Sequence, residues 1–413
     1  MTAAGRRALA PFWYAVLALP AGMTRGFVGV TLTFYLRQHG VPFAAIAGMA
    51  GCAALPFTWK VVMGPAVDAV WTPTRWYVLS VLVAIGSIVA LGFGAGLKAA
   101  MPVMDALALL AGAAAATSAE AVTVAMVQTS PADHRGAISG WLNAGQLGGG
   151  GIGGGGALLI ASSWPGGIGL ASLAIAVVTA PCIAPMLWLR LPRPVHSEAL
   201  KARATGIWQA MTGLLKTRVG LLVALFSLAP TGLNEAANLM PALAKEWGAP
   251  ADLVALVSGV IGGLVSIPGC VLGGYLCRRF SPKAVYIGTG VACALVEVVI
   301  AASHRTPLVF GGLVLLNAAV VGTNWAAITA VVFEILGEEG AATVSSLLSS
   351  FANAPIVVMA MVVGALQQRF GSSAMFLGEA AIAAACLIGL TLLTMLWRPR
   401  PAPRASEALA ATG

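Results

Sequence analysis

Two stretches of sequence decide the fold, GPAVDAVWTPTRWY at 64–77 and GGYLCRRFSPKAVY at 273–286. They align without gaps at a spacing of 209 residues. A glycine, an aromatic residue, a hydroxyl residue, a proline and a tyrosine coincide. Two further alignments have nearly the same spacing: 117–139 with 323–345 at 206 residues, and LPAGMTR ending at Arg25 with APTGLNE ending at Glu235 at 210 residues. The chain therefore reads as two parallel copies of one unit, an organisation typical of two-lobed membrane proteins.

The composition places most of the chain in lipid. Hydrophobic residues make up 59% of it and charged residues 9%, whereas a soluble domain usually carries about 25% charged residues. Twelve apolar stretches are long enough to span a bilayer. They lie at 9–36, 41–63, 76–96, 102–129, 137–161, 167–190, 219–244, 252–276, 284–303, 307–335, 343–366 and 373–397. We expect an all-α integral membrane protein with twelve transmembrane helices.

The net charge of +9 follows the membrane topology and does not indicate nucleic-acid binding. If the N-terminus is cytoplasmic and the helices alternate in direction, 17 of the 23 Lys and Arg residues lie in cytoplasmic segments and 5 in outer loops. This is the positive-inside pattern. We expect a multi-pass protein of a bacterial inner membrane with both termini in the cytoplasm.

The polar segments suggest where the domains divide. The single long polar connection, 191–218, predicts a cytoplasmic linker between an N-terminal six-helix bundle at 1–190 and a C-terminal one at 219–397. The Pro/Ala-rich tail at 398–413 is expected to be disordered.

Helix five contains the run GQLGGGGIGGGG. Gly145, Gly149 and Gly153 recur every fourth residue, which predicts a face that a neighbouring helix can approach closely. Such a face serves static packing or sliding between helices, and the sequence leaves both interpretations open.

The two repeated loops resemble the signature loops of the major facilitator superfamily, of the form G-x-x-x-D-x-x-G-R. The first copy keeps Asp68, but its basic residue comes only at Arg75, and the second has Cys277 in place of the acid. More narrowly, LPFTWKVVMGPAVDAVW at 55–71 resembles the peptide–acetyl-CoA transporter branch, which includes AmpG-type muropeptide permeases, acetyl-CoA transporters and small siderophore permeases. The resemblance implies two six-helix bundles with alternating access, and a central cavity lined by helices one, four and seven, among others.

Three ionisable residues lie deep in predicted helices: Arg25 in helix one, Glu120 in helix four and Glu235 in helix seven. Such groups cost at least ~2.5–3.5 kcal/mol on insertion scales, so they are functional candidates. Arg25 and Glu235 are equivalent in the two repeats and should face each other. Arginine can hold a carboxylate or phosphate by two parallel bonds, and a buried acid that favours its neutral form can carry a proton. A permanent pairing of Arg25 with either acid is the alternative.

Polar residues at helical spacing accompany these charges. Thr117 and Thr123 flank Glu120, and Thr231 and Asn238 flank Glu235. Helices five and ten carry polar stripes of their own. The candidate substrate and proton residues are Arg25, Glu120, Glu235, Asn143, Gln146, Asn238, Asn317, Asn324 and Trp325.

A second group of charges marks the cytoplasmic ends of the helices. Lys60, Asp68, Arg75 and Arg135 are candidates for a salt-bridged gate. Two other acids within predicted helices, Glu297 and Glu379, lie on helices nine and twelve, which are peripheral in this superfamily. We expect Glu379 to be solvated near a membrane end and assign no role to Glu297.

These features predict a proton-coupled secondary transporter that imports a medium-sized anionic solute, of the siderophore or muropeptide type, by alternating access. An exporter or exchanger of another anionic metabolite, or a non-transporting sensor or scaffold, is the alternative. An enzyme is disfavoured because the four histidines lie in or beside loops. No nucleotide-binding motif occurs. We expect a monomer with no metal, cofactor or nucleic-acid partner.

Overall fold

The computed structural model describes residues 10–60, 63, 67, 71–129, 135–164, 167–189, 205, 212–213, 216–333 and 341–396. The predicted linker at 191–218 lies mostly outside these residues, and the predicted tail at 398–413 lies entirely outside them. Nine helices in the described part are long and apolar enough to cross a membrane, and Phe43–Trp59 is a shorter apolar helix. The all-helical membrane fold predicted from the sequence is confirmed.

The described residues of the first half form six helical segments. Their elements are α1 (Pro11–Gly26), η2 (Phe27–Leu32) and α2 (Thr33–Gln38); α3 (Phe43–Ala54) and η3 (Leu55–Trp59); α5 (Pro73–Gly96); α6 (Met101–Thr129); α7 (Arg135–Gly151), η5 (Ile152–Gly156) and α8 (Ala157–Ser163); α9 (Gly167–Thr179), η6 (Ala180–Ile183) and α10 (Ala184–Leu187).

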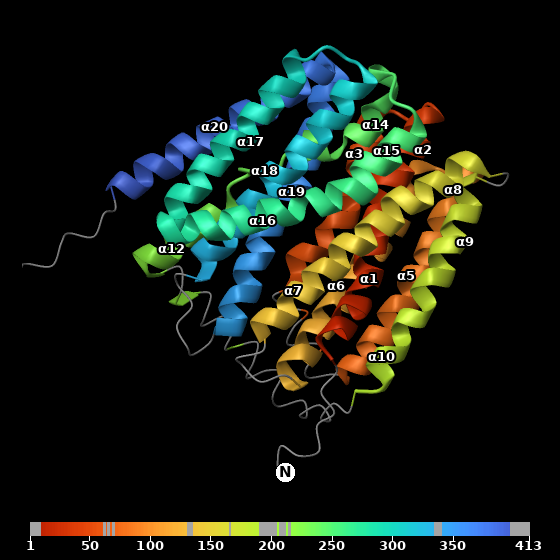
Figure 1. Ribbon diagram of the computed structural model, residues 1–413, viewed down its shortest axis with the longest axis horizontal. Coiled ribbons are helices and arrows are strands. Elements are labelled where there is room, and N and C mark those ends of the chain that lie inside the picture. The colour runs from red at the N-terminus through yellow and green to blue at the C-terminus, as the bar shows by residue number, and fades with distance from the viewer. Residues whose placement is uncertain are drawn as a thin grey trace, which may run out of the picture.

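The second half repeats this order with one interruption. Its elements are α12 (Arg218–Leu228), α13 (Glu235–Asn238), α14 (Met240–Leu243) and η7 (Ala244–Trp247); α15 (Ala251–Val254), η8 (Ala255–Ile261) and α16 (Gly262–Arg279); α17 (Pro282–Ala302); α18 (Pro307–Phe333); α19 (Ala341–Phe370); α20 (Ser372–Leu396). In Figure 1 the red-to-yellow first half lies beside the green-to-blue second half.

The repeated loop owes its hydroxyl–proline pair to helix capping. The hydroxyl of Thr72 accepts a hydrogen bond from the backbone N–H of Arg75, and Pro73 begins α5. In the second copy Ser281 accepts from the N–H of Ala284, and Pro282 begins α17. A hydroxyl at the N-cap and proline at the next position are both favoured where a helix starts, so the sequence repeat is a repeated helix start.

The glycine face predicted for helix five lies on α7 and η5 and packs against α1. A Cβ atom added at Gly145, Gly149 or Gly153 would collide with backbone atoms of α1, at Ala15, Leu19 and Met23. This confirms the predicted close approach. The hydroxyl of Thr31 adds hydrogen bonds to the carbonyls of Gly153 and Gly154, at 3.0 and 2.7 Å.

The predicted continuous helix at 219–244 is wrong, because the chain leaves the helix between α12 and α13. Gly232 and Asn234 in this break have φ angles of +74° and +49°. The side-chain amide of Asn234 donates to the carbonyl of Cys293 at 3.2 Å and to the side-chain oxygen of Asn317 at 2.7 Å. Partners on α17 and α18 therefore hold the break in place.

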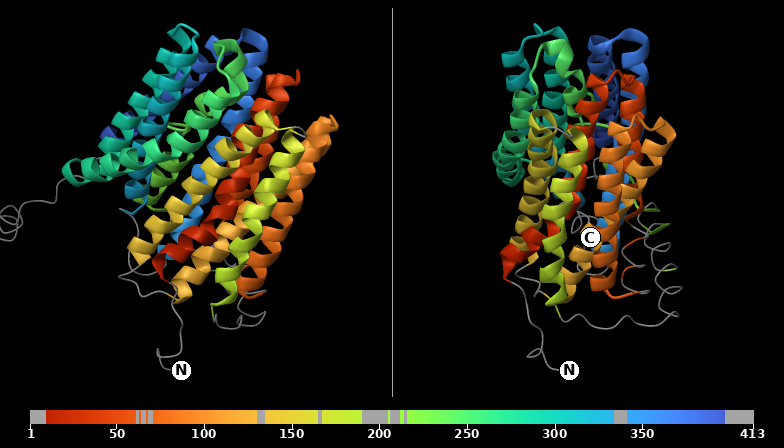
Figure 2. Two further views of the ribbon diagram at one scale, coloured as in Figure 1. Left: turned by 45° about the vertical axis from the view of Figure 1, so that its right-hand side comes forward. Right: turned by 90° about the vertical axis from the view of Figure 1, so that its right-hand side faces the viewer.

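Several pairs of helices join the lobes. Helix α3 packs against α19, and η5 packs against η8. At the upper end of Figure 1, α2 also lies beside α14. Figure 2 shows the two halves from further sides.

Buried apolar residues form separate clusters at the two ends of the molecule. The largest combines both halves, with Phe27, Phe43, Met240, Trp247 and Met375 among its members. At the opposite end, where α1 and α5 begin, the described residues form one cluster from the first half around Tyr14 and Tyr77 and another from the second half around Phe226 and Tyr286. In this conformation the lobes therefore share a core at one end only.

Candidate functional site

A cavity of about 160 Å³ lies between the lobes. The first half contributes residues of α1, η2, α3, η3 and α6, and the second half contributes residues of α13 and α19. Its polar lining consists of Thr24, Arg25, Glu235, Asn238 and Asn353. Most other lining residues are apolar or small, so these few side chains determine what the cavity can bind.

Arg25 projects from α1 and is exposed within this lining. Its guanidinium lies over the ring of Phe57, 5.0 Å from the ring centroid. The amine of Lys60 lies 5.6 Å from the same centroid. Cations within about 6 Å of an aromatic face are attracted to it, so Phe57 stabilises two positive charges next to the cavity.

Glu235 faces Arg25 from the other lobe. The two side chains interact electrostatically, yet between these two described residues there is no N–O contact within the 4 Å of a salt bridge. The side-chain amide of Asn238 donates to Glu235 at 3.3 Å. The geometry thus leaves room between a cation and an anion on opposite lobes.

Lys60 and Glu120 extend this charged group within the first lobe. Lys60 interacts electrostatically with Glu120 and with Arg25. Glu120 is 8% exposed, and Phe57 places Lys60 beside the cavity residues. Lys60 therefore lies with the cavity charges, although the sequence suggested a role in a gate.

The rest of the predicted gate is only partly described. Arg75 lies exposed in the first turn of α5. Asp68 and the side chain of Arg135 lie outside the described residues. The gate stays a prediction.

The polar stripes predicted on helices five and ten lie on α7 and α18, and their residues are not among those that line the large cavity. Asn143 is exposed and Gln146 half-buried on α7, and neither is among the lining residues that the structure describes. On α18, Asn317 accepts the hydrogen bond from Asn234 that holds the helix break. Asn324 donates to the hydroxyl of Thr289 at 3.0 Å. Both α18 asparagines thus have partners within the second lobe.

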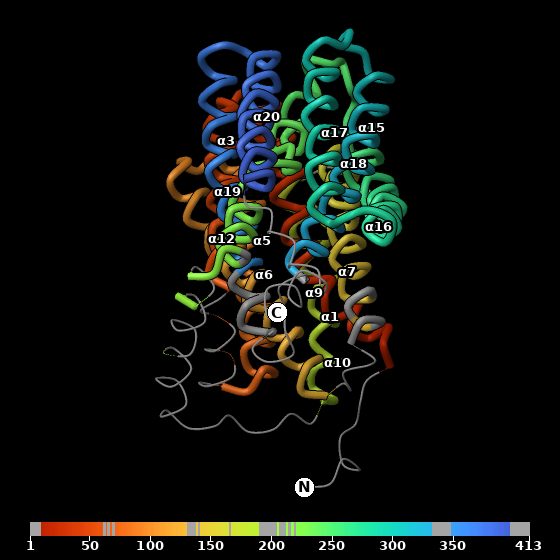
Figure 3. Tube along the Cα trace, turned by 90° about the vertical axis from the view of Figure 1, so that its left-hand side faces the viewer, coloured from red at the N-terminus to blue at the C-terminus, as the bar shows by residue number. Residues whose placement is uncertain are grey.

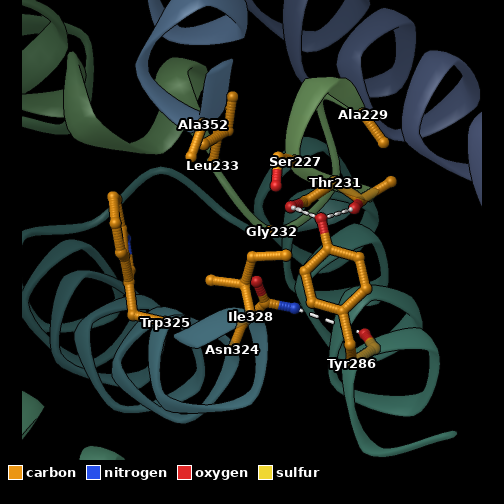
Figure 4. A pocket seen from close by; sticks show the side chains of 10 residues that line it. All are labelled: Ser227, Ala229, Thr231, Gly232, Leu233, Tyr286, Asn324, Trp325, Ile328 and Ala352. Atoms are coloured by element: carbon orange, nitrogen blue, oxygen red, sulfur yellow. Dashed lines mark hydrogen bonds between the residues drawn. The ribbon is translucent and has the colours of Figure 1, made fainter. Parts of the chain in front are cut away.

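Asn324 and Trp325 line a second, much smaller cavity of about 20 Å³ next to the break, shown in Figure 4. The hydroxyl of Tyr286 points into it, with a hydrogen bond of 2.5 Å from the hydroxyl of Thr231. Gly232 is required here, because a Cβ atom at this position would overlap the side-chain amide of Asn324. A space of this size holds about one water molecule, so it is no substrate site.

Sequence reasoning missed three residues at or near the site. Phe57 and Asn353 line the cavity, and Glu379 binds the backbone at the start of α13. The expectation that Glu379 is solvated is wrong, since it is 2% exposed. Phe57 could have been found from its position three residues before Lys60. Nothing in the sequence indicated that a helix break would bring backbone N–H groups to Glu379.

Comparisons with known proteins agree with this architecture. Residues 225–413 match the family model described as Major Facilitator Superfamily. No sequence among the curated proteins matches the chain. Nothing in these comparisons singles out the peptide–acetyl-CoA transporter branch.

Solved structures resemble the whole chain. The nucleoside transporter NupG is 12% identical with a TM-score of 0.70, covering 93% of this chain and 98% of its own. A D-xylose-proton symporter is 13% identical with a TM-score of 0.70, covering 94% and 98%. The xylose transporter XylE from E. coli in its inward-open conformation is 11% identical with a TM-score of 0.68, covering 98% and 100%.

The matched family and these structures are transporters rather than enzymes, as the sequence predicted for this chain. At identities this low the structural likeness establishes the fold. The chain is a multi-pass membrane protein with the major facilitator fold, and its second half matches the family model of that superfamily.

Proposed function

We propose that the chain is a proton-coupled secondary transporter that binds an anionic solute between its lobes. One observation carries this proposal: Arg25 and Glu235, from equivalent positions of the two repeats, line one cavity without forming a salt bridge. An arginine with an open fork can bind a carboxylate or phosphate of a solute. A scaffold would gain more from a closed ion pair.

The size of the cavity bears on the solute. Sites for drug-sized ligands usually measure about 300–1,000 Å³, and this cavity measures about 160 Å³. It suits a small anion as it stands, and a siderophore or muropeptide would require the lobes to separate further. Import across a bacterial inner membrane with cytoplasmic termini remains part of the proposal, and export or exchange is the alternative direction.

Counterflow in proteoliposomes tests the solute class. The panel consists of a small organic anion, a ferric siderophore, an anhydromuropeptide, and the neutral solutes D-xylose and a nucleoside. Exchange of an anionic member, lost in Arg25→Lys, supports the proposal. Exchange of only the neutral solutes, or none in any member, contradicts it.

The coupling acid can be identified with two variants. Protonation of Glu235 would free Arg25 for an anion, and Glu120 is the alternative proton carrier. Replacing the coupling acid by glutamine should abolish accumulation driven by a pH gradient but preserve counterflow, which needs no net proton movement. If Glu235→Gln and Glu120→Gln both still accumulate solute, neither acid couples transport to protons.

A further inference from the structure

The second lobe contains a pair of buried acids that the cavity does not use. Glu297 on α17 and Glu379 on α20 are 1% and 2% exposed. Their helices pack against each other, and Figure 3 shows them side by side. An isolated buried carboxylate is very unfavourable, so this pair needs a physical explanation.

Glu379 holds the start of α13. Its two carboxyl oxygens accept hydrogen bonds from the backbone N–H of Glu235 at 2.9 Å and of Ala236 at 2.7 Å. These two N–H groups lack helical partners because the chain leaves the helix just before them. Glu379 therefore fixes the segment from which Glu235 and Asn238 reach the cavity.

Glu297 completes the pair. Its carboxyl group interacts with that of Glu379, and its Oε1 atom is buried without a hydrogen-bond partner among the described residues. Two ionised carboxylates are both acceptors, so a bond between them requires one proton. Both oxygens of Glu379 already accept backbone N–H groups, so the hydrogen bonds assign this proton to Glu297.

The ionisable groups facing the pair cannot neutralise it. Cys293 faces it from α17 and Glu235 faces it from α13. The other helices packed against α17 and α20 are α12, α16, α18 and α19. Their described charged residues, Arg218, Arg278, Arg279 and Arg369, are all exposed at helix ends, and α18 carries none. A bound proton is thus the compensation that the geometry offers.

We propose that Glu297 and Glu379 form a proton-binding site whose charge positions α13, and with it Glu235, at the cavity. The pair acts as a positioning element, because it contacts the backbone of Glu235. When Glu379 is ionised, its two charge-assisted bonds hold α13; a second proton on the pair weakens them and releases this segment. The role in transport rests on the proposed function, whereas the proton site does not.

Infrared spectroscopy of the purified chain in lipid nanodiscs tests the proton site, with the proton as the probe. The carbonyl band of protonated carboxylic acids is followed across a pH titration. We expect the wild-type protein to contain one such band that is missing in Glu297→Gln and retained in Asp252→Asn, an exposed acid that serves as the matched control. The band should also persist in Glu235→Gln. An unchanged band in Glu297→Gln overturns the proposal.

Hydrogen–deuterium exchange tests the positioning. In Glu379→Gln the amides of Glu235 and Ala236 should exchange at least about 10-fold faster, since one charge-assisted bond is worth ~1.5–3 kcal/mol. In Glu297→Gln they should stay protected, because Glu379 still accepts both. Unchanged exchange in Glu379→Gln overturns the positioning role. If that variant does not fold, wild-type exchange corrected for intrinsic rates should rise over the pH range where the pair gains its second proton, and a rate independent of pH there overturns the role.

These measurements need no transport. A wild-type protein that shows the band and the protection but no counterflow contradicts only the proposed function. Normal counterflow with an unchanged band in Glu297→Gln contradicts only the proton site.

Discussion

The first helices of the two repeats share a proline–glycine pattern but differ in structure. The segment from Pro11 to Gln38 stays helical throughout, although it contains Pro20 and Gly22. Its counterpart from Arg218 to Trp247 is broken around Pro230 and Gly232. Proline and glycine therefore permit the break but do not cause it.

One equivalent position behaves in opposite ways. The hydroxyl of Thr24 donates to the carbonyl of Pro20 within its own helix at 2.8 Å. Asn234, 210 residues later, has left-handed backbone and donates to partners on α17 and α18. Local bonding favours the helix in the first repeat, and bonding to neighbouring helices favours the break in the second.

The neighbouring helices differ as well. Helix α1 packs against Gly145, Gly149 and Gly153 of α7, where the backbones touch. On the register of 206 residues, the corresponding positions of α19 are Phe351, Pro355 and Met359. Side chains of this size prevent the same backbone contact in the second lobe. The comparison teaches that the same repeat unit contains a continuous helix in one lobe and a broken helix in the other, because the helices packed against it differ.

The largest effect is expected at the contact that only the first repeat has. Gly149→Ala should destabilise the protein by more than the ~1–3 kcal/mol typical of overpacking, because the new methyl group meets backbone of α1. Gly148→Ala is the control: its Cβ meets nothing within 4 Å, and it should raise stability by up to ~1 kcal/mol through helix propensity. Thermal unfolding followed by tryptophan fluorescence in detergent measures both variants. Equal midpoints would show that the close contact of Gly149 with α1 does not contribute to stability.

The next effect concerns the two equivalent polar positions. Asn234→Ala should cost about 1–3 kcal/mol, because it leaves the buried side-chain oxygen of Asn317 without its donor. Thr24→Ala removes only a bond within the helix and should cost less than ~1 kcal/mol. Unfolding midpoints of the two variants provide the test. Equal losses would show that the break does not depend on these partners.

Arg25→Lys should lower solute exchange about 10- to 100-fold. Lysine keeps the charge but lacks the planar fork, and a hydrogen bond to a charged group is worth ~1.5–3 kcal/mol. Counterflow into proteoliposomes at matched protein density measures the effect. Solute exchange at the wild-type rate by this variant would show that the guanidinium of Arg25 does not bind the solute.

The smallest effects probe what the repeats share. Tyr77 donates to the carbonyl of Leu17 at 2.9 Å, and Tyr286 donates to that of Phe226 at 3.2 Å, each 60 residues earlier in the chain. Tyr77→Phe should cost ~1 kcal/mol. Tyr286→Phe should cost somewhat more, because it also deprives the Thr231 hydroxyl of its acceptor. Chemical unfolding of both variants checks the order, and a larger loss for Tyr77→Phe would contradict it.

Much of the fold could be predicted from local signals. Apolar length predicted the spans, and the threonine–proline and serine–proline pairs mark where α5 and α17 begin. Glycine spacing predicted a close contact of α7 with a neighbouring helix, and the structure identifies that helix as α1. Less of the candidate site could be predicted from the sequence. Arg25, Glu235 and Asn238 were identified because charged and amide groups are rare inside a membrane. The same rule also selected Asn317 and Asn324, which hydrogen-bond to other residues of the second lobe, because a polar stripe does not reveal whether its partner is a solute or another helix.

The sequence by itself determined the repeat, the membrane spans and the depth of the ionisable residues, since each depends on residues close together in the chain or on a spacing that can be counted. Only the tertiary structure decided that the helix predicted at 219–244 breaks between α12 and α13, and that Glu379 binds the backbone at the start of α13. The break is stabilised by hydrogen bonds to Cys293, Asn317 and Glu379, which lie on three other helices. Hydrogen bonds between residues so distant in sequence leave no local pattern, and only the packed molecule reveals them.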